Sequence, residues 1–297
     1  MTFGARSSDR GHIVGPPIHA TPNDGRTAVV HGGVACCGGD DEPDWMEFAR
    51  IHPRTADTMP QAPPPPAALP AAPPPAPAPP PPGTPFPNSQ VPAWGTPDQE
   101  TFMRAVYDAH VAHALAQHRV FRTGLPSSQL ATVEGHHRMR TDAAPFCRQL
   151  LARARTDRTA AAARGDALAA AASGIGIRSA HRTASEELGI WAGLFPRYYR
   201  DTASRRAAAP GGPHGAAAVA IMVRHYSGRK AAPGFSNHTN GIAVDFTTTQ
   251  GGTSLGAEES QAAAWMASWL HRWLVSNAAT FHFRPLSTEA WHWDYRF

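Results

Sequence analysis

Apolar positions recur at the spacing of an α-helix in four stretches of the chain. The first stretch begins at Thr96, a helix-capping residue that is followed by a proline. The other three cover residues 143–172, 183–191 and 258–277, and the first of these is expected to end near Gly174. These four stretches are predicted to be helices.

Short segments between and after these helices show a different pattern. Over residues 241–248, Ile242, Val244 and Phe246 fall on one face and polar or small residues on the other, as in a half-buried strand. Three more short strands are expected, over residues 175–179 and around 281–283 and 291–293. Because the helices come first and the strands gather late, we predict an α+β fold, with helices packed on a small antiparallel sheet that carries the functional site.

The first third of the chain has another composition. Residues 1–59 are rich in Gly, His and Cys, whereas residues 60–95 are rich in Pro and Ala and hold most of the excess among the 30 prolines. Such a tract favours the extended polyproline conformation, so it is predicted to be a semi-rigid spacer; an SH3-type ligand is the alternative. The predicted organisation is a small N-terminal module (1–59), a linker (60–95) and a main domain (96–297) with a helical extension before its core (145–297).

Composition and charge narrow the functional classes. The chain is 42% hydrophobic and 17% charged, and its net charge of +4 suits either an anionic cell-wall polymer or a solvated basic surface. It contains no recognisable nucleic-acid module, no run of 18 apolar residues that would span a membrane, and no apolar N-terminal stretch typical of a signal peptide. Cys36 and Cys37 are adjacent and Cys147 lies in another region, so no structural disulfide is expected in the main domain.

The most specific chemistry lies in two late segments, 236–245 and 289–292. They supply His238, Asp245 and His292, which are candidate zinc ligands because zinc prefers imidazole nitrogen and carboxylate oxygen and keeps one position open when it is catalytic. Glu289 could lie beside the metal and take a proton from water. With 16 histidines in the chain, a single histidine beside an Asn-Gly turn is more often a solvated side chain, so the prediction rests on the combination.

The pattern Ser-x-His-x-x-Gly-x-Ala-x-Asp, followed later by Glu-x-Trp-His, resembles the D-alanyl-D-alanine carboxypeptidase family of zinc peptidases, the VanY-like group. The resemblance covers about residues 145–297 and includes the segments 177–183, 277–285 and 291–295. It implies a Zn²⁺ enzyme acting on the stem peptides of peptidoglycan, most simply by removing a terminal D-alanine. An L,D-carboxypeptidase and an endopeptidase that cuts cross-links remain open as alternatives.

The resemblance also implies roles for single residues. It makes His238, Asp245 and His292 the metal ligands and Glu289 the general base. Arg182 becomes the cation near the substrate, for which the alternative is a surface ion pair with Glu186. Two further expectations are that Ser236 lies in the substrate cleft, with a turn-capping role as its alternative, and that Trp291 and Trp293 form pocket wall and core, or the reverse.

Departures from the family pattern bear on specificity. His181 stands where the family usually has Tyr, His282 replaces a common Gly, and Asp294 replaces a common Glu. None of them removes a predicted ligand. The change at His181 or at His282 could alter substrate choice or metal occupancy.

The N-terminal module offers a second cluster, made of His12, His19, His31, Cys36 and Cys37. It would suffice for a structural zinc, and the module loosely resembles PAAR-type spike-tip proteins of contractile injection machines; a flexible His-rich tail is the alternative. A wall-cutting enzyme made in the cytoplasm without a signal peptide needs another route, so delivery by a secretion or injection apparatus to the periplasm or the outside is expected, and with it an antibacterial effector (toxin) role. The competing hypothesis is a structural or cargo component of such a machine. A third group of histidines, predicted to serve packing and solvation rather than metal binding, comprises His110, His113, His118, His136 and His137.

Overall fold

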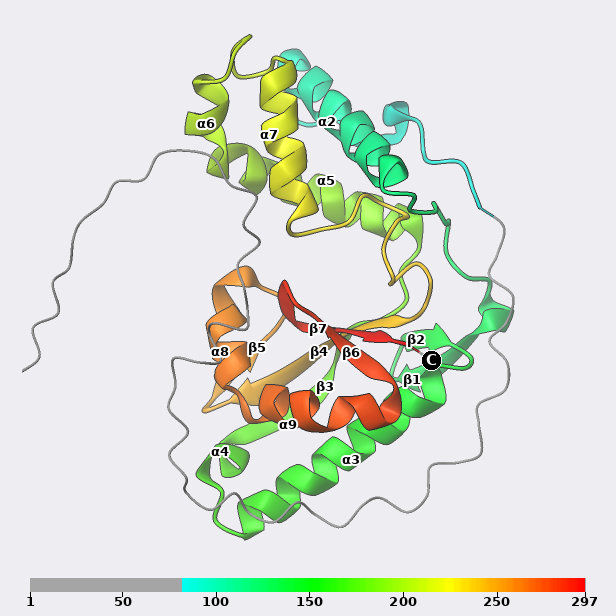
Figure 1. Ribbon diagram of the computed structural model, residues 1–297, viewed down its shortest axis with the longest axis vertical. Helices are drawn as coiled ribbons and strands as arrows, with labels where there is room; N and C mark the ends of the chain where they lie inside the picture. The colour runs from blue at the N-terminus through cyan, green and yellow to red at the C-terminus, as the bar shows by residue number, and fades with distance from the viewer. Residues whose placement is uncertain (1–81, 297) are drawn as a thin grey trace, which may run out of the picture. The chain divides into compact units, whose positions relative to one another are not determined.

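The computed structural model describes residues 82–296 of the chain (Figure 1). The predicted N-terminal module with its His/Cys cluster, the first part of the predicted linker and Phe297 lie outside the described residues. The last part of that linker packs on the main domain: Val91 is buried, and Phe86 and Trp94 pack against a core of aromatic side chains. The backbone carbonyl of Phe86 accepts a hydrogen bond from the hydroxyl of Tyr107 at 3.1 Å.

A five-stranded antiparallel sheet lies at the centre of the described residues. Its strands are β3 (Ala172–Ser179), β4 (Ala243–Gln250), β5 (Thr253–Leu255), β6 (Phe283–Leu286) and β7 (Glu289–Tyr295). The order is β3-β4-β7-β6, and β5 pairs with the end of β4. The predicted α+β class with an antiparallel sheet is confirmed, although β4 is buried on both faces in its first half rather than half-buried.

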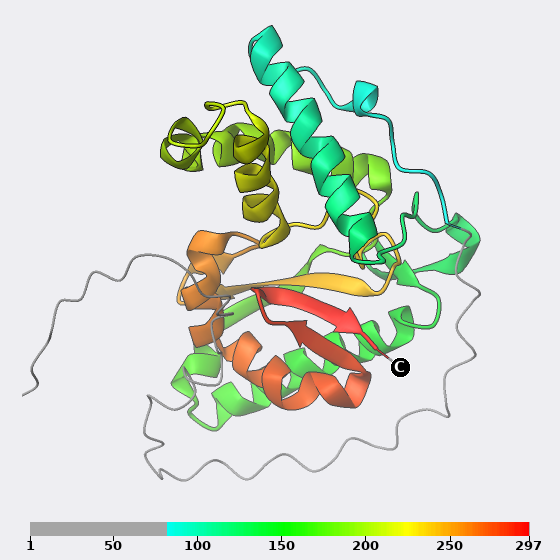
Figure 2. The ribbon, with the colours of Figure 1, turned by 45° about the horizontal axis from the view of Figure 1, so that its top comes forward.

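Helices cover both faces of this sheet (Figures 1 and 2). One face packs against α3 (Ala144–Ala163), α4 (Ala167–Ala170), α8 (Ala262–Ala267) and α9 (Trp269–Asn277). The apolar side chains between these helices and the sheet form one continuous core, which we call the sheet core. Its largest members are Trp265, Trp291, Trp293 and Tyr295.

The other side carries a second helical layer with a core of its own. It consists of α2 (Pro97–Ala116), α5 (Ala184–Asp201), α6 (Ala203–Ala207) and α7 (Ala216–Ser227). Aromatic rings dominate this helical core, and they meet largely edge-to-face or stacked, as ring quadrupoles prefer. Its fully buried rings include Phe102, Tyr107, Trp191, Phe195, Tyr198 and Tyr226.

Short elements complete the described part of the chain. A two-stranded hairpin, β1 (Leu130–Glu134) and β2 (His137–Arg140), stands beside the main sheet and was not expected from the sequence. Four 3₁₀ turns join the larger elements: Asn88–Gln90, Ser127–Gln129, Glu259–Gln261 and Ala278–Phe281. None of the helices between residues 82 and 296 is both long and apolar enough to cross a membrane.

Two predicted helices are broken in the structure. The helix expected over 143–172 ends at Ala163, because Gly165 takes a left-handed φ of 89° and Asp166 caps the short helix that follows. The helix expected over 258–277 is interrupted at Ser268, whose hydroxyl accepts the backbone N–H of His271 and starts a new helix.

Two other element boundaries also differ from the prediction. The helix expected over 183–191 continues to Asp201 and tolerates Pro196 inside it. His282, predicted to lie in a strand around 281–283, has a left-handed φ of 63° and ends the preceding 3₁₀ turn, so strand β6 begins at Phe283.

Candidate active site

His238 is presented by a tight loop between α7 and β4. Its backbone N–H donates to the Ser236 hydroxyl at 3.1 Å, and its carbonyl accepts the N–H of Gly241. Gly241 has a φ of 66°, and a Cβ there would lie 2.6 Å from Leu125 Cδ1 and 3.0 Å from the backbone nitrogen of Arg140. Glycine is therefore needed where the chain turns back into β4, which brings Asp245 to the level of His238.

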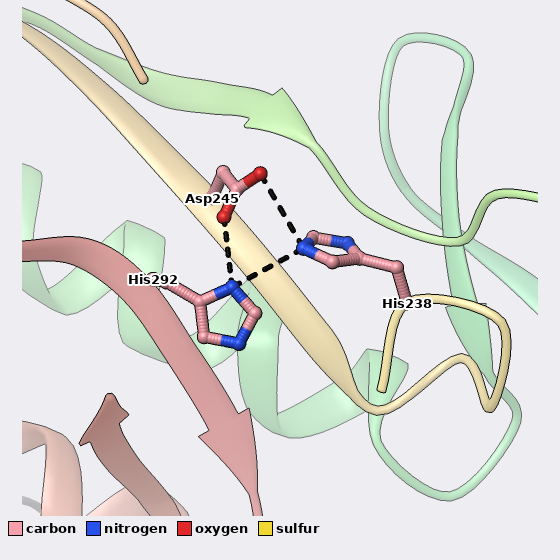
Figure 3. Close-up of side chains that lie close together, drawn as sticks. All are labelled: His238, Asp245 and His292. Atoms are coloured by element: carbon pink, nitrogen blue, oxygen red, sulfur yellow. Dashed lines mark hydrogen bonds and ion pairs between the residues drawn. The ribbon is translucent and has the colours of Figure 1, made fainter. Parts of the chain in front are cut away.

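Three predicted ligands meet in the buried space between β4, β7 and this loop (Figure 3). Nε2 of His238 lies 3.2 Å from Nδ1 of His292 and 3.4 Å from Oδ2 of Asp245. Nδ1 of His292 lies 3.0 Å from Oδ1 of Asp245, its partner in the register of β4 with β7. Among residues 82–296, this is the one group of histidine, cysteine and carboxylate side chains that converges as metal ligands do.

The outer hydrogen bonds fix which ring atoms face inward. Nδ1 of His238 lies 2.6 Å from the carbonyl oxygen of Ala180, which can only accept, so Nδ1 carries the proton and Nε2 offers a lone pair. Nε2 of His292 lies 3.0 Å from Oδ1 of Asp294 and is likewise the donor. Two lone pairs and a carboxylate therefore point at one space, and partners of this kind orient the imidazoles of metal sites.

The pKa values of the three side chains are shifted by their burial and by one another. Burial lowers the pKa of His238 to about 4. Burial acts the same way on His292, but hydrogen bonds to Asp245 and Asp294 prevail and raise its pKa to about 9. The pKa of Asp245 is held well below its usual value by the two imidazoles, although burial opposes this.

The residues present fit zinc. Bond lengths of 2.0–2.2 Å to nitrogen and oxygen in a tetrahedron place neighbouring ligand atoms about 3.3–3.6 Å apart. The three separations, 3.0, 3.2 and 3.4 Å, lie within a few tenths of an ångström of the lower end of this range. His238, Asp245 and His292 would thus hold Zn²⁺ as three protein ligands, a number typical of catalytic rather than structural sites.

Glu289 begins strand β7 and lies beside the ligands without joining them. Its Oε2 is 3.9 Å from Nδ1 of His292 and accepts the indole N–H of Trp291 at 3.2 Å. Its other oxygen, Oε1, accepts a hydrogen bond from Nζ of Lys230 at 3.0 Å. Glu289 is 8% exposed, and both of its carboxylate oxygens are held by hydrogen bonds.

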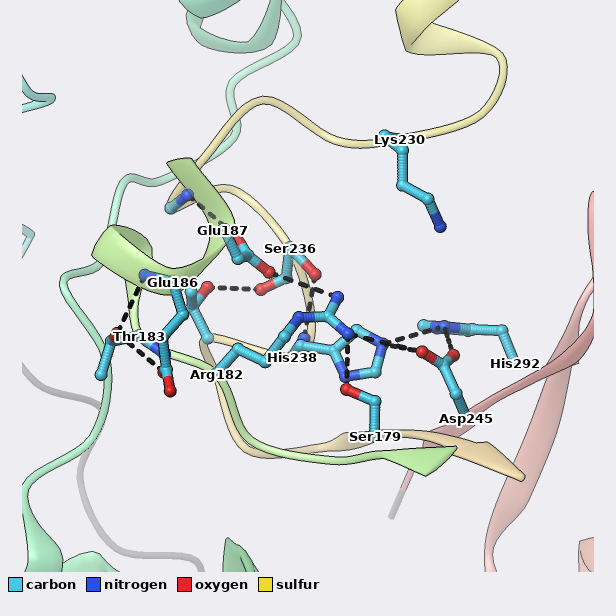
Figure 4. Close-up of polar contacts among 12 residues, drawn as sticks. Ser179, Arg182, Thr183, Glu186, Glu187, Lys230, Ser236, His238, Asp245 and His292 are labelled. Atoms are coloured by element: carbon cyan, nitrogen blue, oxygen red, sulfur yellow. Dashed lines mark hydrogen bonds and ion pairs between the residues drawn. The ribbon is translucent and has the colours of Figure 1, made fainter. Parts of the chain in front are cut away.

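Arg182 lies against the same group, at the turn before α5 (Figure 4). Its Nη1 donates to the Ser179 hydroxyl at 2.6 Å and lies 3.4 Å from Oδ2 of Asp245, while Nη2 is 3.6 Å from Oε1 of Glu187. Glu186, the alternative partner considered from the sequence, instead caps the first turn of α5 through Thr183.

Glu187 is a further buried acid that the sequence reasoning did not single out. It accepts the backbone N–H of Gly234 at 2.9 Å and lines the cavity above the ligands. Burial raises its pKa, although Arg182 opposes the shift. Ser236 caps the turn at His238 and also lines the cavity, and its role in binding substrate stays a prediction.

The other residues singled out in the sequence pack in the core or connect loops. Trp291, expected in the pocket wall or core, is 2% exposed within the sheet core, and so is Trp293 at 1%. Trp291 contacts the site through its hydrogen bond to Glu289. His181 accepts the backbone N–H of Leu125 at 3.0 Å and ties two loops together, and His282 stacks edge-on against Phe146.

A cavity of about 770 Å³ opens above the ligands, between the sheet and the helical layer. Cationic side chains dominate its polar lining, among them Arg119, Arg140, Arg182, Arg229 and Lys230. Apolar side chains from both layers, including Ile190 and Leu286, complete the wall. Its size and charge suit an anionic peptide.

Comparisons with known proteins give structural neighbours only. No protein-family model matches the chain, and no curated protein matches it. A mutant of the vancomycin-resistance D,D-pentapeptidase VanY from a VanB-type cassette, in complex with Zn(II), is 20% identical with a TM-score of 0.36, and the match covers 58% of this chain and 82% of that one. VanYB in complex with D-alanine-D-alanine is also 20% identical with a TM-score of 0.36, and the match covers 58% of this chain and 81% of that one.

A third solved structure belongs to another carboxypeptidase. The LD-carboxypeptidase LdcB is 15% identical with a TM-score of 0.35, and the match covers 59% of this chain and 71% of that one. At these three TM-scores, the backbones superpose only in part.

Proposed function

We propose that the chain is a zinc-dependent peptidase of peptidoglycan stem peptides, which acts as a D,D-carboxypeptidase and removes a terminal D-alanine. The observation that carries the proposal is the convergence of His238, Asp245 and His292 at tetrahedral spacing, with Glu289 3.9 Å from one ligand atom. Three ligands, one unligated carboxylate and a cavity form the set of parts that metal-assisted hydrolysis needs. The resemblance of the sequence motifs supplies the substrate class.

Each residue has a defined part in the reaction. His238, Asp245 and His292 would hold a zinc ion, which would act as a Lewis acid that polarises a peptide carbonyl and makes water more acidic. Glu289 accepts the proton of the attacking water on Oε2 and passes it to the nitrogen of the departing amino acid. Trp291 keeps Oε2 directed at the ligands. Burial of the site excludes bulk water and strengthens these interactions.

Arg182 is proposed to stabilise negative charge on the substrate. Its guanidinium touches Asp245 and therefore lies next to the position of the scissile carbonyl, where an oxyanion develops. Ser236 and Glu187 line the adjoining part of the cavity and offer hydrogen-bond acceptors to the peptide backbone.

Delivery is proposed from the sequence alone. The Pro-rich linker and the His/Cys-rich N-terminal module would couple the peptidase to a secretion or contractile injection apparatus, which carries it to the wall of a target cell. The test is growth arrest of bacteria that express the chain in the periplasm but not in the cytoplasm. Equal growth in both cases would contradict the effector role and leave the peptidase proposal standing.

Mass spectrometry of defined muropeptides tests the reaction. The zinc-loaded full-length chain is incubated with stem peptides that end in D-Ala-D-Ala, with and without a chelator, and beside Glu289→Ala. Loss of one terminal alanine that depends on both zinc and Glu289 supports a D,D-carboxypeptidase. Release of a terminal D-residue that is bonded to an L-residue would assign an L,D-carboxypeptidase, and cleavage of cross-links would assign an endopeptidase. No cleavage by the zinc-loaded chain would contradict the peptidase proposal.

A further inference from the structure

Lys230 is the only lysine among the 27 lysines and arginines of the chain. Every other permanently charged side-chain cation is an arginine, including those that line the same cavity. The two side chains differ chemically: arginine offers a rigid planar fork, whereas lysine is a compact charge with three N–H donors on a flexible stem. The place of the single lysine is therefore informative.

The helical layer anchors this lysine above the site. Its backbone N–H donates to the carbonyl of Tyr226 at 2.7 Å, at the end of α7. Tyr226 is completely buried, and its hydroxyl donates to the carbonyl of Trp191 at 2.8 Å. From this fixed point the side chain descends toward His292 (Figure 4) and reaches Glu289 on the sheet. Lys230 thus spans the cavity from one layer to the other.

Two of its three N–H donors are available to a ligand. Among residues 82–296, the ammonium of Lys230 has Glu289 as its ion-pair partner, at 3.0 Å, and its side chain is 29% exposed in the lining of the cavity. Arg182 is more committed: it is 19% exposed and its charge faces two carboxylates, those of Asp245 and Glu187. Of the two cations near the ligands, Lys230 is the better receptor for a second anion.

The distances also match an exopeptidase substrate. Nζ of Lys230 and Nδ1 of His292 contact opposite oxygens of the Glu289 carboxylate, at 3.0 and 3.9 Å. An anion on Lys230 and a carbonyl at the candidate ligands would then lie on either side of the Glu289 carboxylate. In a carboxypeptidase substrate, one residue separates the scissile carbonyl from the terminal carboxylate.

We infer that Lys230 is the receptor for the C-terminal carboxylate of the peptide, an inference that rests on the proposed carboxypeptidase function. One N–H of its ammonium holds Glu289 and the other two bind the substrate. The terminal carboxylate then fixes the scissile bond beside the base, and Arg182 is left to the charge that develops on the scissile carbonyl.

Matched peptides test this role. N-acetyl-D-Ala-D-Ala and its C-terminal amide differ only in the carboxylate, and calorimetry measures their binding to the full-length chain, metal-free and zinc-loaded. We expect wild-type protein to bind the acid about 10- to 100-fold more tightly than the amide, the usual range for a charge-assisted hydrogen bond. Lys230→Met should abolish this preference by weakening the acid alone, and Lys230→Arg should restore part of it.

Arg229→Met is the matched control. Arg229 is the preceding residue and lines the same cavity, but its guanidinium is paired with Glu259 at 2.7 Å, so its loss should leave the preference for the acid unchanged. Hydrolysis gives a second readout: Lys230→Met should raise KM for the acid and leave KM for the amide unchanged.

The outcomes separate this inference from the proposed function. If the wild-type protein binds the peptide acid in a Lys230-dependent manner but hydrolyses neither peptide, the peptidase proposal fails, while the assignment of Lys230 as the carboxylate receptor stands. If Lys230→Met lowers kcat equally for acid and amide and keeps the preference, Lys230 only positions Glu289 and the inference is overturned. Equal binding of acid and amide by wild type overturns it as well.

Discussion

Asp294 accepts a hydrogen bond from Nε2 of His292 at 3.0 Å, on the side of the ring that faces away from His238. Both residues lie on β7, two positions apart and therefore on the same face of the strand. Asp294 is itself held by the side-chain amide of Asn237 at 3.0 Å, in the loop that presents His238. These hydrogen bonds thus orient the ring of His292 and tie it to the loop that presents His238.

Loss of Asp294 should weaken zinc binding. Asp294→Ala is expected to lower zinc affinity about 10- to 100-fold, because the His292 ring loses the acceptor that fixes its tautomer and orientation. Asp294→Asn keeps an acceptor and should lose less. Competition with a fluorescent zinc chelator measures the affinity. Asp142→Asn is the control, since Asp142 is an equally buried carboxylate that pairs with Arg140 instead; an equal effect of both changes would contradict the assigned role.

Glu289→Ala should separate metal binding from turnover. Glu289 is not a ligand, so the variant is expected to retain zinc, while hydrolysis of a D-Ala-D-Ala peptide falls by about two to four orders of magnitude because the proton acceptor is lost. His238→Ala should lose zinc and activity together. Metal content after gel filtration and initial rates give both quantities. Full activity of Glu289→Ala would disprove its assignment as the base.

Gly241→Ala should destabilise the fold and loosen the site. The left-handed backbone and the approach to the Arg140 backbone are expected to lower the free energy of unfolding by about 1–3 kcal/mol. Zinc affinity should fall too, because the turn sets the distance between His238 and Asp245. Gly135→Ala is a matched control: Gly135 also has a positive φ, of 55°, but a Cβ there meets nothing within 4 Å. Urea unfolding and chelator competition compare them, and equal losses of zinc affinity would contradict the role of the turn.

His110 should make stability depend on pH. Burial, with help from the charges of His113 and Arg119, lowers its pKa to about 4 from 6.5. The folded state therefore favours the neutral ring, which accepts the indole N–H of Trp191 at 3.2 Å. This contribution is complete above pH 6.5 and is lost as pH falls toward 4, by about 3 kcal/mol in all.

A variant series isolates this contribution. Urea unfolding between pH 4 and 7 should show a shallower pH dependence for His110→Phe than for wild type. Trp191→Phe removes the hydrogen bond but keeps a buried imidazole, so it should retain the slope of the wild type at lower absolute stability. Identical slopes for wild type and His110→Phe would show that the ring is not the titrating group.

Local signals in the sequence predicted part of this structure well. The capping box at Thr96 marks the start of α2, and the motif around His238 and Asp245 correctly placed a turn before a strand. The hairpin β1–β2 was missed because its strands are short, mostly half-buried and without a continuous apolar face. The interruption at Ser268 was also missed, since a serine inside an apolar-periodic stretch reads as a solvent-facing helical position.

The ligand set was accessible to sequence reasoning, but its surroundings were less so. Asp294 was noted only as an exchange for Glu, although its i+2 spacing from His292 on a strand could have indicated contact. The carbonyl of Ala180 that orients His238 carries no side-chain signal at all. Lys230 does carry one, because a lysine that occurs once in an arginine-rich chain is conspicuous in the sequence alone.

The cavity lies between two cores that are packed separately. Asp245, His292 and Glu289 are built on the sheet and His238 on the loop before β4, whereas Lys230 is anchored on the helical layer through Tyr226. A small tilt of one layer against the other would therefore change the length of the Lys230–Glu289 contact while both cores stay intact. Substitutions among the buried aromatic rings around Tyr226 should therefore change turnover by altering the distance between Lys230 and Glu289.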